Sequence, residues 1–184
     1  YLSMNLPNAI TLARLFVVPV IVVMILDGRM EAAFWLALCA AVSDAIDGII
    51  AKQFNMETVL GAYLDPIADK ALLVCAYIAL GHEGYLPMWL VVAVVSRDVL
   101  IVGGALLFHT LTQSLEMTPL MVSKVNTAAQ LILAVVVVGS EAFGIHSSGI
   151  RDMLVYVVGA TTLVSGATYV IGWTRLAAEI EGSD

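Results

Sequence analysis

Charged residues are scarce in this chain. Asp, Glu, Lys and Arg together make up 12% of the 184 residues, whereas hydrophobic residues make up 61%. A soluble globular domain carries roughly 25% charged and 45–50% apolar residues. So few charges cannot cover a water-facing surface of this size, and the mean hydropathy of +0.98 has the same implication. The composition therefore excludes an ordinary soluble domain and indicates a protein whose main solvent is lipid.

Cysteine and histidine are also rare, and positive charge is lacking. The two cysteines, Cys39 and Cys75, lie in apolar stretches, which predicts small buried packing side chains rather than a disulfide. The three histidines show no metal-ligand spacing. A formal net charge of −7 argues against nucleic acid as a partner. No Pro-rich or Ser-rich linker divides the chain, so we expect a single domain over residues 1–184.

Six long apolar segments alternate with short polar breaks. A helix that crosses the hydrocarbon needs about 20 mostly apolar residues, and its backbone satisfies its own hydrogen bonds. Breaks are expected at Gly28, from Asn55 to Gly61, from Gly81 to Gly84, from Thr110 to Thr118, and from Ser140 to Gly149. The pattern predicts an all-α, polytopic membrane protein with six transmembrane helices, at residues 9–26, 32–51, 62–80, 87–108, 122–138 and 153–173.

The basic residues are placed unevenly along these segments. If the N-terminus is inside, only Arg29 and Arg151 lie on the far side of the membrane. By the positive-inside rule, both termini are expected in the cytoplasm. The chain is compact and shows no transit segment, so we expect a bacterial inner (plasma) membrane, with the active site facing the cytoplasm. The basic residues on the cytoplasmic side are Arg14, Lys52, Lys70, Arg97, Lys124 and Arg175.

Four aspartates surround the connection between the second and third segments. Asp44 and Asp47 are three residues apart near the end of the second span. Asp65 and Asp69 are four residues apart near the start of the third. Residues at these spacings share a helix face. The short connection predicts that the two helices are antiparallel neighbours, so we expect the four carboxylates to converge near the cytoplasmic interface.

Four carboxylates at that depth require a counter-charge. A single aspartate at the centre of a span costs about 2.5–3.5 kcal/mol, and neighbouring carboxylates repel one another. A divalent cation removes both costs, and carboxylate oxygens favour Mg²⁺, Mn²⁺ or Ca²⁺. Gly48 and Gly61 leave room for a nucleotide or phosphate near the backbone, although glycine also serves helix packing in membranes. Ion-transport sites also use such carboxylates, so a metal-ion or lipid transporter is an alternative on these residues alone.

The stretch from Asp44 to Asp69 resembles the signature of the CDP-alcohol phosphotransferases, Asp-x₂-Asp-Gly-x₂-Ala-Arg-x₈-Gly-x₃-Asp-x₃-Asp. Every fixed position matches except Lys52, which stands where the pattern has arginine. Lysine keeps the charge but loses the planar two-pronged contact of arginine with phosphate. The six-span layout is also similar to the family, so the resemblance covers nearly the whole chain and implies the CDP-alcohol phosphotransferase fold.

The resemblance implies a reaction and a set of site residues. A phosphatidyl group passes from CDP-diacylglycerol to an acceptor hydroxyl, CMP is released, and Asp69 acts as the general base. Family members are commonly homodimers, so we expect a homodimer. A transporter would place polar residues across the full membrane depth, whereas here they gather on one side. The implied metal ligands are Asp44, Asp47, Asp65 and Asp69, and the implied contacts with the CDP-lipid are Thr11, Asp47, Gly48, Ala51, Lys52 and Gly61.

Polar residues in the fourth and fifth segments indicate where the acceptor binds. An arginine within a span is unexpected without a partner, and Arg97 is such a residue. Because Asp98 is adjacent in sequence, we expect it to point elsewhere on the helix and Arg97 to face an anionic ligand. Lys124 and Asn126 lie near the start of the fifth span. Together with Arg97, they suit the binding of a phosphate group on the acceptor. The alternatives are a structural pair with a carboxylate for Arg97 and an interfacial anchor for Lys124.

The sequences around these residues are similar to one branch of the family. Ser-Arg-Asp-Val from Ser96 and Ser-Lys-Val-Asn-Thr-Ala from Ser123 resemble the CMP-forming cardiolipin synthases. This similarity implies phosphatidylglycerol as the acceptor and cardiolipin as the product. The alternative is a phosphatidylglycerophosphate synthase, which uses glycerol 3-phosphate.

Overall fold

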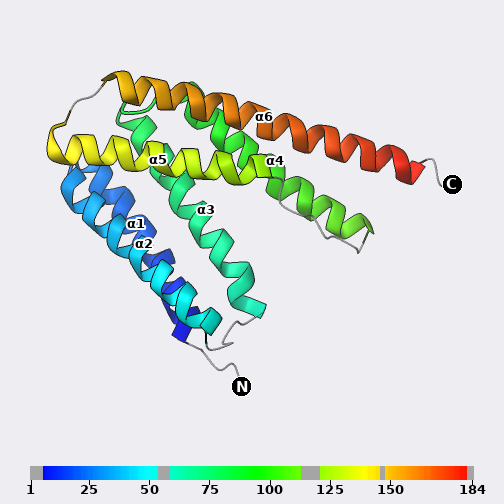
Figure 1. Ribbon diagram of the computed structural model, residues 1–184, viewed down its shortest axis with the longest axis horizontal. Helices are drawn as coiled ribbons and strands as arrows, with labels where there is room; N and C mark the ends of the chain where they lie inside the picture. The colour runs from blue at the N-terminus through cyan, green and yellow to red at the C-terminus, as the bar shows by residue number, and fades with distance from the viewer. Residues whose placement is uncertain (1–5, 54–58, 113–120, 146–147, 182–184) are drawn as a thin grey trace. The chain divides into compact units, whose positions relative to one another are not determined.

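The described part of the chain consists of helices joined by short turns. The computed structural model describes residues 6–53, 59–112, 121–145 and 148–181, and describes side chains for 15–43, 70–104, 121–145, 148–175 and 178. Within these ranges there is no strand, which confirms the expected all-α class. Six helices form (Figure 1): α1 (Leu6–Leu26), α2 (Met30–Gln53), α3 (Val59–His82), α4 (Met88–Thr112), α5 (Met121–Phe143) and α6 (Ser148–Glu181).

Each helix contains nearly all of one predicted apolar segment and continues beyond it. The break expected through Gly61 is wrong at its end, because α3 already begins at Val59. The break expected up to Gly149 is also too long, because α6 begins at Ser148. The backbone hydrogen bonds of a helix continue past the apolar segment that hydropathy detects. With 34 residues, α6 is about 51 Å long, longer than a hydrocarbon core of about 30 Å.

Three glycines end helices in the same way. Gly28, Gly84 and Gly144 have φ values of 72°, 79° and 66°, in the left-handed region that favours glycine. After Gly28, the amide of Arg29 donates to Met24 O at 2.8 Å, which closes the last turn of α1. Equivalent bonds follow Gly84 and Gly144. These are Schellman-type ends, and they confirm the breaks expected near Gly28 and Gly84.

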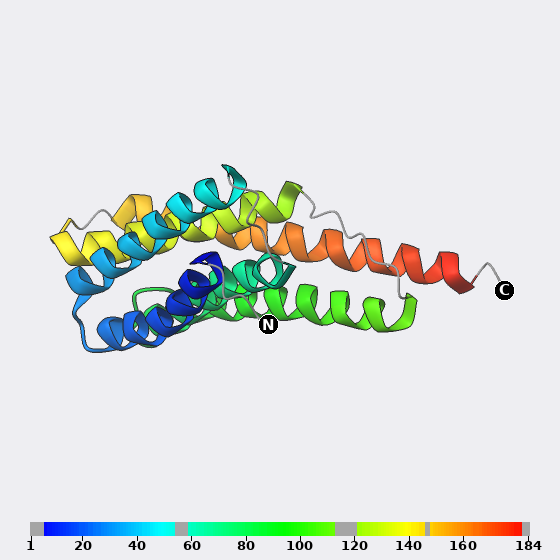
Figure 2. The same cartoon turned by 90° about the horizontal axis from the view of Figure 1, so that it is seen from below.

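The chain divides into two compact units. Unit 1 comprises Tyr1–Leu86 and Ala134–Ser147, and therefore contains α1, α2, α3 and the end of α5. In unit 1, α1 packs against both α2 and α3. Figures 1 and 2 show that α1 and α3 run in one direction and α2 in the opposite direction. Ile25 of α1 and Tyr77 and Leu80 of α3 are fully buried.

Unit 2 comprises Pro87–Leu133 and Ser148–Asp184, and therefore contains α4, the start of α5, and α6. Here α4 packs against α6, and both run in the same direction while α5 runs in the opposite one (Figures 1 and 2). Leu90, Val94 and Val158 are fully buried. The ring of Trp89 lies against Gly159, where a Cβ would come within 2.8 Å of it. Small residues on one helix thus accommodate aromatic rings from the other.

Two described segments are long and apolar enough to cross a membrane. They are Met121–Phe143 and Ser148–Arg175. Shorter apolar segments lie at Leu15–Leu26, Met30–Ser43 and Lys70–His82. Six helices are therefore seen, whereas membrane crossing by all six stays a prediction.

Both cysteines are free thiols, as expected, but the expected burial is wrong for Cys39, which is exposed. Cys75 is partly buried. An apolar segment does not by itself tell which of its sides is packed.

Candidate functional site

The residues predicted to bind metal and nucleotide lie on one end of unit 1. Asp44 and Asp47 are in the C-terminal half of α2, and Asp65 and Asp69 are in the N-terminal half of α3. Figure 1 shows that α2 ends, and α1 and α3 begin, at this same end. Both aspartate pairs are helical, so the spacings of three and four residues place each pair on one helix side. The expected antiparallel course of α2 and α3 is confirmed. In the part of the chain that the structure describes, each of them packs against α1, and their direct contact stays a prediction.

The contacts of these residues stay predictions. The side chains of all four aspartates lie outside the described part of the chain. The surroundings of the residues predicted to contact the CDP-lipid are also outside the described part, namely Thr11 on α1 and Gly48, Ala51, Lys52 and Gly61 on α2 and α3. Gly48 lies inside α2, whereas Gly61 lies in the first turn of α3.

The donor set fits a hard divalent cation. Among the residues with described side chains, no group of three or more His, Cys, Asp or Glu could hold a metal. The predicted ligands are outside that set and consist of carboxylates alone, two on each of two antiparallel helices. Carboxylate oxygens are the ligands that Mg²⁺, Mn²⁺ and Ca²⁺ prefer.

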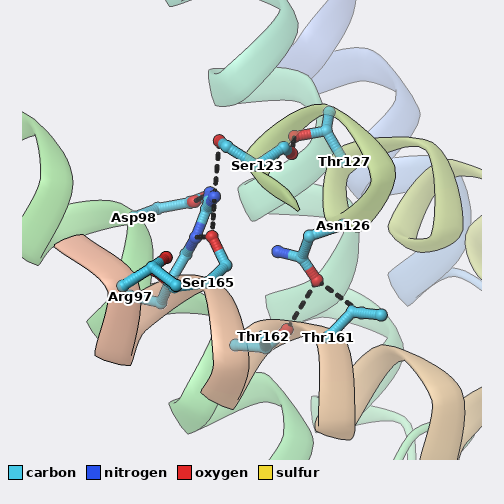
Figure 3. Close-up of polar contacts among 9 residues, drawn as sticks. Arg97, Asp98, Ser123, Asn126, Thr127, Thr161, Thr162 and Ser165 are labelled. Carbon is cyan, nitrogen blue, oxygen red and sulfur yellow. Dashed lines mark hydrogen bonds and ion pairs between the residues drawn. The ribbon is translucent and has the colours of Figure 1, made fainter. Parts of the chain in front are cut away.

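A buried ion pair lies in unit 2. Arg97 and Asp98 on α4 are 4% and 6% exposed, and Arg97 Nη1 lies 2.7 Å from Asp98 Oδ1 (Figure 3). The expectation that Asp98 points elsewhere is therefore wrong. Adjacent residues diverge around a helix axis, but the long flexible side chain of arginine turns back to its neighbour. The contact of Arg97 with a ligand stays a prediction.

Two serines accept hydrogen bonds from Arg97. Its Nε and Nη2 both donate to Ser165 Oγ on α6, at 3.2 and 2.6 Å. Nη2 also donates to Ser123 Oγ on α5, at 2.6 Å. Both hydrogen-bonding edges of the guanidinium are therefore occupied, and Arg97 ties α4 to α5 and α6. An anionic ligand would contact this side chain most directly by replacing a neutral serine hydroxyl.

A second buried polar group lies one turn further along α5. Asn126 is 0% exposed, and its Oδ1 accepts hydrogen bonds from Thr161 at 2.8 Å and Thr162 at 3.0 Å. Its Nδ2 is buried and has no hydrogen-bond partner. In Figure 3 this nitrogen points away from the threonines, on the side where Ser165 lies. A buried unpaired donor costs about 1–3 kcal/mol, and a ligand oxygen would satisfy it.

Lys124, the third residue predicted to bind the acceptor, is exposed on α5 next to Ser123. The sequence predicted that Asn126 and Lys124 bind the acceptor, and it did not predict the hydroxyl groups of α6 that hydrogen-bond with Arg97 and Asn126. Thr161, Thr162 and Ser165 stand at helical spacing within an apolar helix. Polar residues so placed are typical of interhelical hydrogen bonding, and that spacing is the signal that could have identified them.

A cavity of about 520 Å³ lies elsewhere in unit 1, near the turn between α1 and α2. Arg29, Glu31, Trp35 and Glu141 are among its lining residues. This turn is at the opposite end of α2 from Asp44 and Asp47, so the cavity is not the predicted catalytic site.

Comparison with known proteins identifies the class of enzyme that carries these features. Residues 4–173 match the CDP-alcohol phosphatidyltransferase family. The chain belongs to this family of enzymes, which agrees with the aspartate signature and the six helices.

Relatives that carry two different enzyme names are about equally similar to this chain. The chain is 33% identical over 182 residues to the "Cardiolipin synthase (CMP-forming) / mitochondrial hydrolase fusion protein" of Schizosaccharomyces pombe, covering 91% of this chain and 31% of that protein. It is 29% identical over 181 residues to the cardiolipin synthase (CMP-forming) of Rattus norvegicus, covering 90% and 60%.

The second group is represented by the CDP-diacylglycerol–glycerol-3-phosphate 3-phosphatidyltransferase of Bacillus subtilis. Identity is 31% over 181 residues, covering 90% of this chain and 93% of that protein. The chain spans less than two thirds of the length of the two cardiolipin synthases. Overall identity does not choose between the two kinds of enzyme.

Proposed function

We propose that this chain is a cardiolipin synthase. It transfers the phosphatidyl group of CDP-diacylglycerol to a hydroxyl of phosphatidylglycerol and releases CMP. The observation that carries the proposal is the aspartate signature from Asp44 to Asp69, borne by antiparallel helices in a chain that belongs to the CDP-alcohol phosphatidyltransferase family. Family membership favours this enzyme over the transporter alternative.

The chemistry is assigned to the helix ends of unit 1. Asp69 takes the proton of the phosphatidylglycerol hydroxyl as its oxygen attacks the phosphorus next to the lipid glycerol. A new phosphorus–oxygen bond forms, the bond from that phosphorus to the CMP oxygen breaks, and CMP leaves with the electron pair. Thr11, Asp47, Gly48, Ala51, Lys52 and Gly61 are assigned to the CDP-lipid.

A divalent cation is part of the proposal. Mg²⁺ or Mn²⁺ is favoured, and Ca²⁺ is also compatible with the donor set. When bound, the cation neutralises the diphosphate and the charge that develops on CMP. The residues assigned to hold it are Asp44, Asp47, Asp65 and Asp69.

Acceptor recognition is assigned to Arg97, Lys124 and Asn126 of unit 2. The buried, unpaired Nδ2 of Asn126 supports this assignment, because it offers a donor to a ligand oxygen. The exposed ammonium of Lys124 offers a charge to the acceptor phosphate. Arg97 serves both as an anchor for Ser123 and Ser165 and as a phosphate contact.

The membrane setting is also proposed. Within each unit, successive helices run in opposite directions, as successive membrane crossings require. All six helices are taken to span a bacterial inner membrane, with both termini and the catalytic aspartates on the cytoplasmic side, in a homodimer. Exposed large apolar side chains support a lipid environment, Phe16 being 76% exposed and Leu163 68%.

A phosphatidylglycerophosphate synthase that uses glycerol 3-phosphate is the second candidate. It is favoured by the Bacillus subtilis relative, because the match covers 93% of that protein.

The experiment that tests the proposal supplies labelled CDP-diacylglycerol in vesicles with either phosphatidylglycerol or glycerol 3-phosphate. Mass spectrometry identifies the lipid product. We expect cardiolipin and CMP in equal amounts with phosphatidylglycerol. Phosphatidylglycerophosphate formed with glycerol 3-phosphate, and no cardiolipin, would establish the second candidate. No CMP with either acceptor would contradict both.

A further inference from the structure

We propose that Asp98 sets the acceptor preference by cancelling the charge of Arg97. The site then favours a phosphodiester, with one negative charge, over a phosphomonoester, with nearly two. The inference rests on the proposed function, because it concerns the residues assigned there to the acceptor. It assigns to Asp98 a role in specificity that the motif alone does not indicate.

The geometry makes the cancellation local and constant. Asp98 Oδ1 is 2.7 Å from Arg97 Nη1, and both side chains are almost fully buried. Ser165 and Ser123 hold the other nitrogens of the guanidinium, so Arg97 is kept beside its counter-charge. The ion pair is neutral as a whole.

The other described polar groups of this cluster add little charge. Ser123, Asn126, Thr162 and Ser165 are neutral. Lys124, the exposed neighbour of Ser123 in the sequence, is assigned to the same acceptor and carries one positive charge. The cluster of Arg97, Asp98 and Lys124 therefore has a single net positive charge. Without Asp98, the same cluster would have two.

The two acceptor classes differ in charge by nearly one unit. A phosphomonoester such as glycerol 3-phosphate carries about −1.5 to −2 at pH 7, because its second pKa is near 6. The phosphodiester of phosphatidylglycerol has no second ionisation and carries one negative charge. At an effective dielectric constant of about 20, one extra unit charge at roughly 10 Å changes binding on the order of tenfold. A cluster with one net positive charge therefore matches the diester and leaves the monoester incompletely neutralised.

The test changes the charge at nearly constant shape. Asp98→Asn keeps an oxygen that can accept from Arg97 and removes the negative charge. We expect the ratio of kcat/KM for glycerol 3-phosphate to kcat/KM for phosphatidylglycerol to rise about tenfold. Asp98→Glu and Ser165→Ala disturb the same contacts while preserving the charge. In both, the ratio should stay within about twofold of the wild-type value, even where overall activity falls.

A second variant tests the same idea at an exposed position. It is needed because removing one member of a buried ion pair is strongly destabilising, and the Asp98→Asn protein can fail to fold for that reason alone. Lys124→Gln removes a positive charge from an exposed side chain. We expect the same ratio to fall by a similar factor, because the dianion loses more attraction than the monoanion.

The outcomes separate this inference from the proposed function. Opposite shifts in folded Asp98→Asn and in Lys124→Gln support it. If Asp98→Asn does not fold, a lower ratio in Lys124→Gln supports the charge account on which the role of Asp98 rests, and an unchanged ratio overturns it. The role of Asp98 is overturned, and the proposed function stands, if the wild-type enzyme makes cardiolipin and the variants keep its ratio of kcat/KM for the two acceptors. That role is likewise overturned if Asp98→Glu or Ser165→Ala shifts the ratio as much as Asp98→Asn. A wild-type enzyme that releases no CMP with either acceptor overturns the proposed function itself.

Discussion

At the level of single residues, the desolvation of charge governs the polar part of unit 2. Arg97 is 4% exposed, and a guanidinium in that position needs both a counter-charge and hydrogen-bond acceptors. Asp98 provides the first, and Ser123 and Ser165 provide the second. Breaking a buried pair of this kind by removing one partner typically costs about 3–5 kcal/mol. The pair is therefore structural, whatever it also contributes to acceptor recognition.

The first prediction concerns the proposed general base. Asp69→Asn keeps the size of the side chain but cannot take a proton from the acceptor hydroxyl. We expect CMP release to fall by about 10²–10⁴-fold, the range that general-base catalysis contributes. The measurement is CMP formation from CDP-diacylglycerol and phosphatidylglycerol by the purified variant.

A matched control makes this result specific. Asp152→Asn is the same chemical change at an exposed position on α6 and should retain wild-type activity. Both variants should unfold at the wild-type temperature. Near-normal turnover by Asp69→Asn would remove Asp69 as the base.

Residue-level prediction from the sequence was uneven for a physical reason. The helical backbone expected around Asp44 and Asp47 and around Asp65 and Asp69 is confirmed, because it depends only on local geometry, whereas the contacts of the four carboxylates stay a prediction. The direction of Asp98 was predicted wrongly, because it depends on how the flexible Arg97 side chain folds back. The partners of Arg97 on α6 required tertiary packing that no local spacing contains.

At the level of elements, small residues determine how α4 meets α6. The ring of Trp173 lies directly against Gly104, in the space where a Cβ would stand. Trp89 lies against Gly159 in the same manner, but here the ring belongs to α4 and the glycine to α6. Two such contacts, one from each helix, fix the pair along its length. Close packing of this kind leaves no room for an added methyl group.

The second prediction follows from this packing. Gly→Ala inside a helix normally stabilises it by about 1 kcal/mol. We expect Gly104→Ala instead to lower the free energy of unfolding by about 1–3 kcal/mol, because the methyl group would overlap the ring of Trp173. Thermal unfolding in detergent measures the change.

The neighbouring residue Gly103 provides the control. No atom lies within 4 Å of a Cβ built there, so Gly103→Ala should leave stability unchanged or slightly raised. In a protein that already carries Trp173→Ala, adding Gly104→Ala should not lower the free energy of unfolding any further. Equal stability of the two single glycine variants would contradict the proposed contact.

The helices themselves were largely predictable, because long apolar segments must satisfy their own backbone groups. Their ends were less predictable. Hydropathy marks where a helix is apolar, whereas α5 continues to Phe143 and α6 to Glu181 through polar residues. Gly28 and Gly84 were reliable stops, because the left-handed conformation needed there favours glycine.

At the level of the whole molecule, the number of crossings determines where the chain ends lie. Six helices occur in the described ranges, and an even number of crossings returns the chain to the side on which it started. The third prediction is that tags at both termini are cleaved by protease in inside-out membrane vesicles and protected in right-side-out vesicles. A tag at residue 29, in the turn between α1 and α2, should show the reverse pattern. Termini on opposite faces would contradict the six-span proposal.

The central claim is tested most directly by measuring CMP release by the wild-type protein before and after removal of divalent cations. The four aspartates are proposed to work through a bound cation, so strong chelation should reduce CMP release from CDP-diacylglycerol and phosphatidylglycerol to background. Adding Mg²⁺ or Mn²⁺ in excess should restore it, while Na⁺ at matched ionic strength should not. Unchanged turnover under strong chelation would contradict the claim that these carboxylates form a metal-dependent phosphatidyltransferase site.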